Sequence, residues 1–341
     1  MPHASRGHRA RDGAASDAEA VGPAAAPAGP WSPVRPRGPA AADRPAATSA
    51  VGAAGADAGG RARRSSPWDA ARVRWENRLI RTRIMTRLSS LPAALRERLA
   101  QRSALKVIAG LMNFDAASVA RVARAAGRGG ADLIDVACDP ELVALAMRDS
   151  GGVPVCVSSV EPEQFVAAVA AGAAMVEIGN FDAFYPQGRI FGAAEVLELT
   201  RQTRALLPEV VLSVTVPHVL PMDQQEQLAV DLVAAGADLI QTEGGTSAKP
   251  FSAGSLGLIE KAAPTLAAAH SISTALLQAG LSTPVLCASG LSAVTVPMAI
   301  AAGAAGVGVG SAVNRLNDEL AMVAVVRGLR EALGSDLTLR V

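Results

Sequence analysis

The chain has 341 residues, and its net charge of +1 hides an uneven distribution: residues 1–100 contain 17 arginines against 8 acidic residues, so the remainder is acidic. An acidic globular part argues against nucleic-acid binding, which requires a basic face. No segment reaches the ~20 consecutive apolar residues of a membrane span, and no secretory signal is visible, so we expect no membrane insertion.

The first 84 residues differ from the rest of the chain. Residues 1–67 are dominated by Ala, Gly, Pro and Arg and show no hydrophobic periodicity, which is typical of a disordered segment. Two origins for residues 1–84 stay open: a gene start placed too early, with the true start at Met85, or a plastid presequence. Arginine and alanine fit a presequence, but the acidic residues do not. We predict a disordered extension over 1–84 and a short helical lead-in over 85–104.

From residue 105 onward, a short pattern recurs along the chain. An alanine-rich helical run ends at Gly-Ala, and a run rich in Val, Ile or Leu follows, at Gly130, Gly172, Gly236 and Gly303. Glycine at this place is typical of a helix C-terminus. Further apolar runs follow Pro154, Pro208 and Pro284, and residues 105–113 supply another. The pattern predicts eight strands that alternate with helices.

Short, continuously apolar strands are typical of a parallel sheet whose outer face is covered by helices. Eight of them over 105–336 predict a single α/β domain, a (β/α)8 TIM barrel. An open doubly wound sheet is the competing architecture, and the fourfold pairing of strand–helix units disfavours it. Asp115 and Asp139 are predicted helix N-caps, with Pro140 in the first helical position.

The last two predicted strands end in glycine-rich turns, CASGLS (287–292) and GVGVGSAVNR (306–315). Glycine lets the backbone approach an anion closely, and barrels frequently bind a substrate phosphate at this place. The turns therefore predict a site for a small phosphorylated ligand, unless their small residues only allow the strands to close. The candidate phosphate-binding residues are Ser289, Gly290, Gly308, Gly310 and Ser311. Further ligand contacts are expected from Asn113, Asn180, Gly244, Gly245 and Thr246 at other strand ends.

Three acidic residues, Asp135, Glu177 and Glu243, lie within apolar strands. The alternation of side chains along a strand turns each carboxylate into the barrel. Burial raises the pKa of a carboxyl, which suits general acid–base catalysis near neutral pH. The alternative is a structural ion-pair layer in which Lys106 reaches Asp135 or Glu177. Thr215, at the end of the fifth strand, and His218, after it, are expected to orient the substrate. His218 is also a candidate acid or base, with capping of the loop as the alternative.

Covalent aldolase chemistry requires a lysine near the strand ends. The three lysines of the chain are Lys106, Lys249 and Lys261. Lys106 is placed low on its strand, Lys261 on a helix and Lys249 in a polar loop. A Schiff base is therefore the weaker mechanism.

Four of the seven phenylalanine and tyrosine rings lie in EIGNFDAFYPQGRIFG, residues 177–192. The rings follow the predicted fourth strand, so they belong to a loop at the site. We expect one or two of them to anchor this loop, with Asn180 and Asp182 facing the pocket. Rings at a rim can also shed water from a ligand. Most of the stretch is thus predicted to be a lid over a site that Glu177 lines.

No spacing of His, Cys and carboxylates predicts a structural zinc site, and no cofactor is firmly predicted; flavin mononucleotide and Mg²⁺ stay open. The cysteines form no CxxC pair and are expected to be buried thiols in a reducing compartment. Three functions stay open: an isomerase, epimerase or lyase acting on a small phosphorylated metabolite, a non-catalytic ligand sensor, and a flavoprotein. Oligomerisation stays open as well.

Several stretches in order closely resemble one family, that of the hypothetical chloroplast reading frame twenty-three of photosynthetic prokaryotes and algal plastids. The stretches are LKVIAGLMNFD, EIGNFDAFY, LSVTVPH, IQTEGGTS, EKAAPTLAAA and VLCASGLS…AAGAAGVGVGSAVNR. The resemblance covers about residues 90–335. It implies an aldolase-type, phosphate-binding barrel, no particular activity, and a place in bacterial cytoplasm or plastid stroma.

Overall fold

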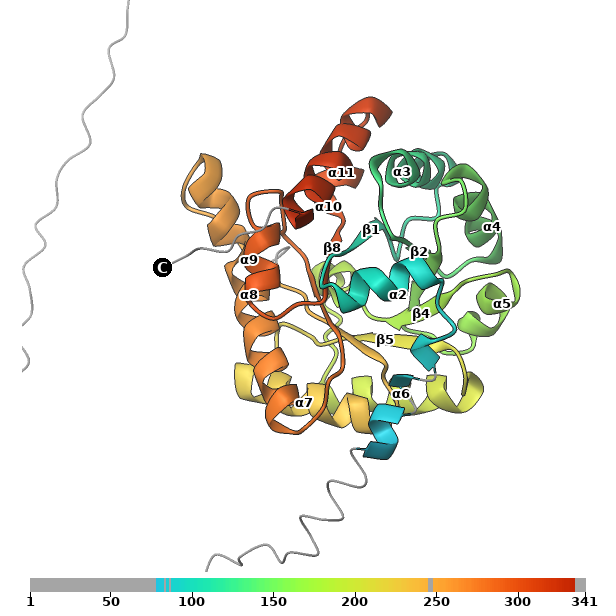
Figure 1. Ribbon diagram of the computed structural model, residues 1–341, viewed down its shortest axis with the longest axis vertical. Coiled ribbons are helices and arrows are strands. Elements are labelled where there is room, and N and C mark those ends of the chain that lie inside the picture. Colours follow the sequence, from blue (N-terminus) through green and yellow to red (C-terminus); the bar gives the residue numbers. More distant parts are fainter. Residues whose placement is uncertain (1–77, 83, 86, 245–247, 335–341) are drawn as a thin grey trace, which may run out of the picture. The chain divides into compact units, whose positions relative to one another are not determined.

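The computed structural model describes residues 78–82, 84–85, 87–244 and 248–334 (Figure 1). Of the disordered extension predicted over 1–84, residues 1–77 therefore lie outside the described residues, as do Gly245 and Thr246, whereas residues 78–82 and 84 are helical. Among the described residues, no helix combines the length and apolarity needed to cross a membrane.

The strands form a closed barrel in which every neighbouring pair is parallel and the first strand pairs with the last. The predicted TIM barrel is confirmed, and each predicted strand is present. The strands are β1 (Ala104–Gly110), β2 (Leu133–Ala137), β3 (Val155–Ser159), β4 (Met175–Ile178), β5 (Val211–Thr215), β6 (Leu239–Gln241), β7 (Val285–Ala288) and β8 (Gly306–Val309).

Helices surround the strands (Figure 1). They are α2 (Ala93–Ala100), α3 (Ala116–Gly129), α4 (Pro140–Asp149), α5 (Gln164–Ala170), α6 (Ala193–Leu206), α7 (Met222–Ala235), α8 (Gly254–Gln278), α9 (Val296–Ala301), α10 (Ser311–Asn314) and α11 (Glu319–Gly334), with two 3-10 turns after β4, η1 (Phe181–Ala183) and η2 (Tyr185–Gln187). The predicted caps are confirmed: Asp115 accepts from the Ala117 amide, and Asp139 accepts from the amides of Glu141 and Leu142.

An apolar layer closes the N-terminal end of the barrel. Leu91, Leu95 and Leu99, before and on α2, are buried against the inward side chains that begin the strands, which are Leu133, Cys156, Met175, Val211, Leu239 and Leu286. In Figure 1, α2 lies across this end of the strands. The N-terminal end of the lumen is therefore lined by apolar side chains.

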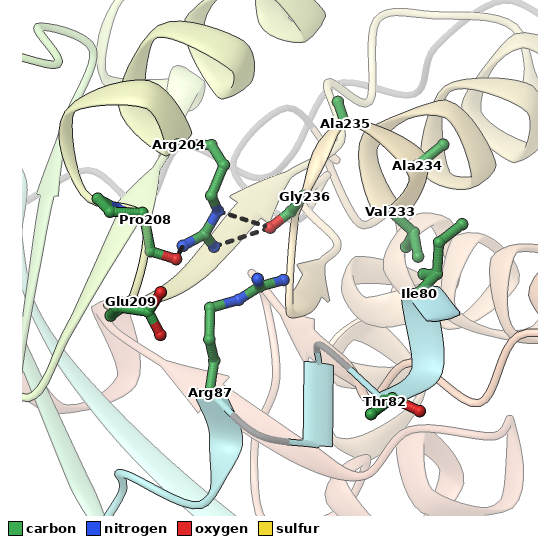
Figure 2. Close-up of a pocket in the computed structure, with 10 residues that line it drawn as sticks. All are labelled: Ile80, Thr82, Arg87, Arg204, Pro208, Glu209, Val233, Ala234, Ala235 and Gly236. Carbon is green, nitrogen blue, oxygen red and sulfur yellow. Dashed lines mark hydrogen bonds between the residues drawn. The ribbon is translucent and has the colours of Figure 1, made fainter. Parts of the chain in front are cut away.

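Residues before α2 also pack on the barrel. The Nε atom of Arg87 donates to Asp238 Oδ1 over 2.7 Å, and a terminal nitrogen of Arg204 donates to Asp238 Oδ2 over 2.8 Å. Figure 2 shows Arg87 and Arg204 side by side in a cavity of about 450 Å³, where Arg204 also donates to the Gly236 carbonyl. This cavity lies at the N-terminal ends of β5 and β6, opposite the end where barrel sites are built.

Candidate active site at the C-terminal mouth

Directly above the apolar layer, the barrel interior becomes polar. The inward side chains at this level are buried and lie on six different strands: Lys106, Asp135, Ser158, Glu177, Ser213 and Gln241. Barrel interiors are usually filled by branched apolar side chains at every level. A polar layer in the middle of the lumen is therefore a departure that requires a specific network of partners.

Lys106 lies at the centre of this layer. Its Nζ atom donates to Glu177 Oε2 over 2.7 Å and to Gln241 Oε1 over 3.0 Å, and lies 3.7 Å from Asp135 Oδ2. Burial alone would lower the pKa of Lys106, but the charges of Asp135 and Glu177 outweigh it and raise the pKa above its ordinary value. The amine is therefore a protonated cation at neutral pH and a poor nucleophile.

Glu177 is surrounded by hydrogen-bond donors. Besides Lys106, Ser213 donates to Oε2 over 2.8 Å, Gln241 donates to Oε1 over 2.6 Å, and Asn180 lies 3.4 Å from Oε1. These donors satisfy both oxygens of the buried carboxylate. The ion pair that the sequence left open as an alternative is thus present, and it joins Glu177 to Lys106 across the lumen.

Asp135 accepts fewer hydrogen bonds than Glu177. Ser158 donates to Oδ1 over 2.6 Å, and Asn180 donates to Oδ2 over 3.2 Å. Burial raises the pKa of Asp135 to about 6, because the repulsion of Glu177 adds to desolvation and the attraction of Lys106 only partly opposes it. A carboxyl with this pKa exchanges a proton near neutral pH, which suits a general acid or base.

Asn180 covers the polar layer from the side of the mouth. Its backbone is left-handed, with φ of 63°, and this conformation turns its amide toward both Asp135 and Glu177. The preceding Gly179 has φ of 144°, and a Cβ atom there would lie 2.2 Å from Thr215 Oγ1. Glycine at 179 thus allows the chain to turn inward directly after β4. Thr215 is buried and accepts from Gln241 over 3.3 Å.

A second polar group, which we call the rim group, consists of Asp182, Tyr185, His218 and Glu243 on the loops after β4, β5 and β6. The Nδ1 atom of His218 lies 3.1 Å from Glu243 Oε1 and 3.5 Å from Asp182 Oδ1. The Tyr185 hydroxyl and the His218 backbone amide both donate to the same oxygen of Glu243. The other oxygen of Glu243, Oε2, is buried and has no hydrogen-bond partner among the described residues.

The electrostatics of the rim group follow from burial of two carboxylates beside one imidazole. Burial raises the pKa of Glu243, although His218 and Tyr185 oppose the shift. Burial alone would lower the pKa of His218, but its hydrogen bond to Glu243 and the charges of Glu243 and Asp182 together outweigh this effect and raise the pKa. The pKa of Tyr185 is raised by burial and by the charge of Glu243, so its hydroxyl stays a donor.

The aromatic loop over residues 181–191 lies across the mouth of the barrel. Phe181 and Phe191 are buried with ring centroids 4.5 Å apart, and Phe184 packs edge-on against Phe191. The predicted anchoring by one or two rings agrees with this packing. Asp182 also accepts from Ser289, on the loop after β7, over 3.2 Å. The loop is therefore bonded to three other strand ends through Asp182 and Tyr185.

The residues predicted to bind phosphate lie together at the ends of β7 and β8, where Ala288 pairs with Gly308. Ser289 and Gly290 both have positive φ, at 73° and 72°. Gly310 precedes α10, which begins at Ser311. Gly308 faces the polar layer, because a Cβ atom there would lie 3.5 Å from Gln241 Oε1.

The other predicted contacts are distributed around the mouth. Asn113 donates to the Ala109 carbonyl and to Ser118, outside the polar layer. Gly244 lies directly after Glu243, with φ of 142°. Ser213 and Gln241 were not assigned roles from the sequence, although their alternation with Thr215 and Glu243 in LSVT and LIQTE is the pattern that marks inward positions.

Comparison with known proteins identifies the family. Residues 91–339 match the family described as "Protein of unknown function (DUF561)". The chain belongs to this family. "Uncharacterized protein ycf23" of Cyanophora paradoxa is 43% identical over 225 residues, which cover 66% of this chain and 90% of that relative. The protein of the same name from Pyropia yezoensis is 36% identical, over 68% of this chain and 83% of the relative. The predicted membership is confirmed.

Solved structures share the arrangement of the chain at low identity. Thiamine phosphate pyrophosphorylase from Pyrococcus furiosus is 18% identical, with a TM-score of 0.44, and the match covers 69% of this chain and 98% of that one. "QR15, an Aldolase" is also 18% identical, with a TM-score of 0.48 and coverage of 68% and 95%. At this level, the similarity concerns the fold alone.

Proposed function

We propose that this family member is an enzyme that acts on a small phosphorylated metabolite by proton transfer, as an isomerase, an epimerase or a lyase without a covalent intermediate. The observation that carries the proposal is the buried set of Lys106, Asp135 and Glu177 in the mouth half of the barrel. Buried ion pairs are rarely favourable for stability alone, and ionisable groups with shifted pKa cluster at functional sites.

The roles follow from the charge of each group. Asp135, with a pKa of about 6, takes or returns the proton. Removal of a proton beside a carbonyl places negative charge on the carbonyl oxygen, and the Lys106 ammonium stabilises that charge. Glu177 holds Lys106 in position through its 2.7 Å hydrogen bond. Thr215, His218 and Glu243 orient the substrate from the rim.

The phosphate is assigned to the loops after β7 and β8. The positive φ of Ser289 and Gly290 turns the backbone there, and Gly308, Gly310 and Ser311 keep the facing loop free of large side chains. Backbone amides in such turns suit an anion. A substrate bound there extends toward Asp135 only after the aromatic loop moves, because Asn180 covers the polar layer. The proposed location is the cytoplasm of a photosynthetic bacterium or a plastid stroma.

The proposal is tested by hydrogen exchange in heavy water. The full-length chain is incubated with sugar phosphates, triose phosphates and free phosphate, and NMR follows the loss of a carbon-bound proton in each compound. We expect exchange in one phosphorylated compound, no exchange with Asp135→Asn, and no binding with Ser311→Asp. Glu195→Gln, which changes an exposed carboxylate outside the site, serves as the control and should exchange like the wild type.

The alternative is a ligand sensor without turnover, and one observation favours it: the polar layer satisfies its own hydrogen bonds under the closed loop. A sensor binds one of the phosphorylated compounds, with a shift in melting temperature, and exchanges no proton in any of them. Binding without exchange would therefore replace the enzyme proposal. Flavin mononucleotide belongs in the same panel, since a flavoprotein is yellow when purified.

A further inference from the structure

The rim group contains three side chains with metal-binding atoms. Asp182, His218 and Glu243 each offer one such atom, and the three atoms lie within 4.8 Å of one another. They come from the loops after three successive strands, β4, β5 and β6. Convergence of an imidazole and two carboxylates from separate loops is the arrangement from which catalytic metal sites are built.

The distances within the rim group agree with those around a small divalent ion. At metal–ligand distances of about 2.0–2.2 Å, neighbouring ligands of a tetrahedral ion are about 3.3–3.6 Å apart. The observed separations from His218 Nδ1 are 3.1 Å to Glu243 Oε1 and 3.5 Å to Asp182 Oδ1. These two separations match those of ligands that share one ion, and the Asp182 and Glu243 atoms lie within 4.8 Å of each other.

A second observation points to a ligand at this place. The Glu243 side chain is 2% exposed, yet within the described ranges its Oε2 atom has no hydrogen-bond partner, and Asp182 Oδ1 is also buried without one. A buried carboxylate oxygen without a partner loses its hydration without compensation. Across the described part of the chain, neither carboxylate forms an ion pair with a lysine or an arginine. A cation bound by both oxygens of Glu243 and by Asp182 Oδ1 would satisfy the two oxygens that lack a partner.

The type of ligand selects the type of ion. Mg²⁺ and Ca²⁺ take oxygen ligands, whereas an imidazole suits Zn²⁺ and the later transition metals. Three protein ligands with a further open position are typical of catalytic zinc. We propose that Asp182, His218 and Glu243 bind a divalent transition cation of the zinc type, with the open position facing the mouth of the barrel.

This inference goes beyond the proposed function, because it adds a cofactor to the rim and leaves proton transfer to the Lys106 layer. Binding through Nδ1 requires the neutral imidazole with its proton on Nε2. The ion therefore replaces a proton at Nδ1 or on the carboxylates, and that proton is released to solvent. A substrate oxygen at the open position would be polarised beside the proposed phosphate loops.

Binding is measured on the full-length, metal-stripped chain without any substrate. Zn²⁺ affinity is obtained by competition with a chromophoric chelator, and Co²⁺ is added as a spectroscopic substitute. We expect one tight site per chain, proton release on binding, and visible Co²⁺ absorption without thiolate-to-metal charge transfer. Asp182→Asn and Glu243→Gln should each weaken Zn²⁺ binding by at least about tenfold.

Controls separate this site from other donors in the chain. Glu195→Gln alters a partly exposed carboxylate in the same region and keeps all three ligands, so it should bind Zn²⁺ like the wild type. The combined change of His3, His8 and His270 to Gln removes the remaining histidines and should also leave the tight site intact. Thermal unfolding of each variant confirms that it is folded.

The outcomes are distinct from those of the exchange experiment. Absence of a tight site in the wild type, or full affinity in both folded ligand variants, would overturn the metal proposal. Charge-transfer absorption would place the ion on cysteine instead and would overturn it too. Proton exchange that proceeds in the metal-free chain would leave the proposed enzyme standing without the ion.

Discussion

The ammonium nitrogen of Lys106 on β1 lies 2.7 Å from a carboxylate oxygen of Glu177 on β4, and neither side chain is more than 1% exposed. The two strands are not neighbours in the barrel, so this ion pair spans the lumen. It fixes the level at which the interior changes from apolar to polar. Both the stability and the proposed chemistry of the molecule therefore depend on the same contact.

Replacing Lys106 with methionine should destabilise the fold strongly. The change leaves Glu177 and Asp135 buried without their cation, a loss of about 3–5 kcal/mol for a buried pair. Urea unfolding of the wild type and of the Lys106→Met variant measures this loss of unfolding free energy. Arg128→Met is the matched control, because Arg128 is 65% exposed in its pair with Glu319 and should cost at most about 1 kcal/mol. Equal effects of the two changes would show that the Lys106 pair contributes little.

The stability of the wild type should fall as the pH rises from about 4 to about 7 through the contribution of Asp135. Its pKa is about 6 in the folded chain against an ordinary value of 3.8. A carboxyl with a raised folded pKa stabilises the fold fully below the unfolded value, and this contribution is lost as the pH rises through the folded value. Lys106, whose pKa is also raised, remains charged over this range.

Asp135→Asn tests this pH dependence, because asparagine does not titrate. We expect the variant to lack the part of the decline that Asp135 causes, so the difference in unfolding free energy between the two proteins changes with pH in this window. Urea unfolding at a series of pH values measures it. A difference that stays constant across the window would place the folded pKa of Asp135 at its ordinary value.

Gly179→Ala should disrupt the entry of the aromatic loop. The backbone at 179 has φ of 144°, and the new Cβ atom would lie 2.2 Å from Thr215 Oγ1. We expect a loss of at least about 1–3 kcal/mol, since strain and overlap add. Gly192→Ala, at the other end of the loop, is the control: no atom lies within 4 Å of the new Cβ atom and φ is −88°. Thermal unfolding of both variants measures the loss of stability that each change causes.

Tyr185→Phe should loosen the aromatic loop without unfolding the barrel. The hydroxyl donates to Glu243, and hydrogen bonds to charged groups contribute about 1.5–3 kcal/mol. Amide hydrogen exchange over 181–191 should become faster, while exchange in the strands stays unchanged. Gln187→Ala removes an exposed side chain of the same loop and should leave the rate unaltered. Unchanged protection in Tyr185→Phe would mean that the phenylalanine packing alone holds the loop.

Arg87→Ala should show that residues before the family match stabilise the barrel. The match begins at residue 91, yet Arg87 bonds to the buried Asp238. Loss of this contact leaves Asp238 with Arg204, so we expect a partial loss of about 1–3 kcal/mol by urea unfolding. Arg128→Ala removes an exposed pair and serves as the control. If the two changes cost the same, the segment before residue 91 is dispensable for stability.

The barrel itself could be predicted from the sequence because its signals are local. Glycine after each helix, apolar runs of strand length and the caps at Asp115 and Asp139 are all properties of neighbouring residues. Pro264 is the instructive exception: a proline usually ends or kinks a helix, but α8 runs from Gly254 to Gln278 through it. Its ring packs near Gly244, and this tertiary contact is invisible in the local sequence.

The candidate site could be predicted only in outline. Alternation along the strands shows that Asp135, Glu177 and Glu243 point inward, but it does not show which of them meet. Lys106 was placed too low to be reactive, and its long side chain in fact joins two carboxylates at mid-height. The rim group depends on where three loops converge, which is a property of the closed barrel and not of any one segment.

The apolar layer beneath Lys106 closes the N-terminal end of the lumen. In the described part of the chain, Leu133, Met175 and Leu239 fill this end, so a ligand of the proposed kind would find no second exit past them. Such a ligand would enter and leave through the mouth alone, so one ligand must be released before the next one binds. Passage along the whole length of the barrel would be blocked by the same apolar layer that packs against α2.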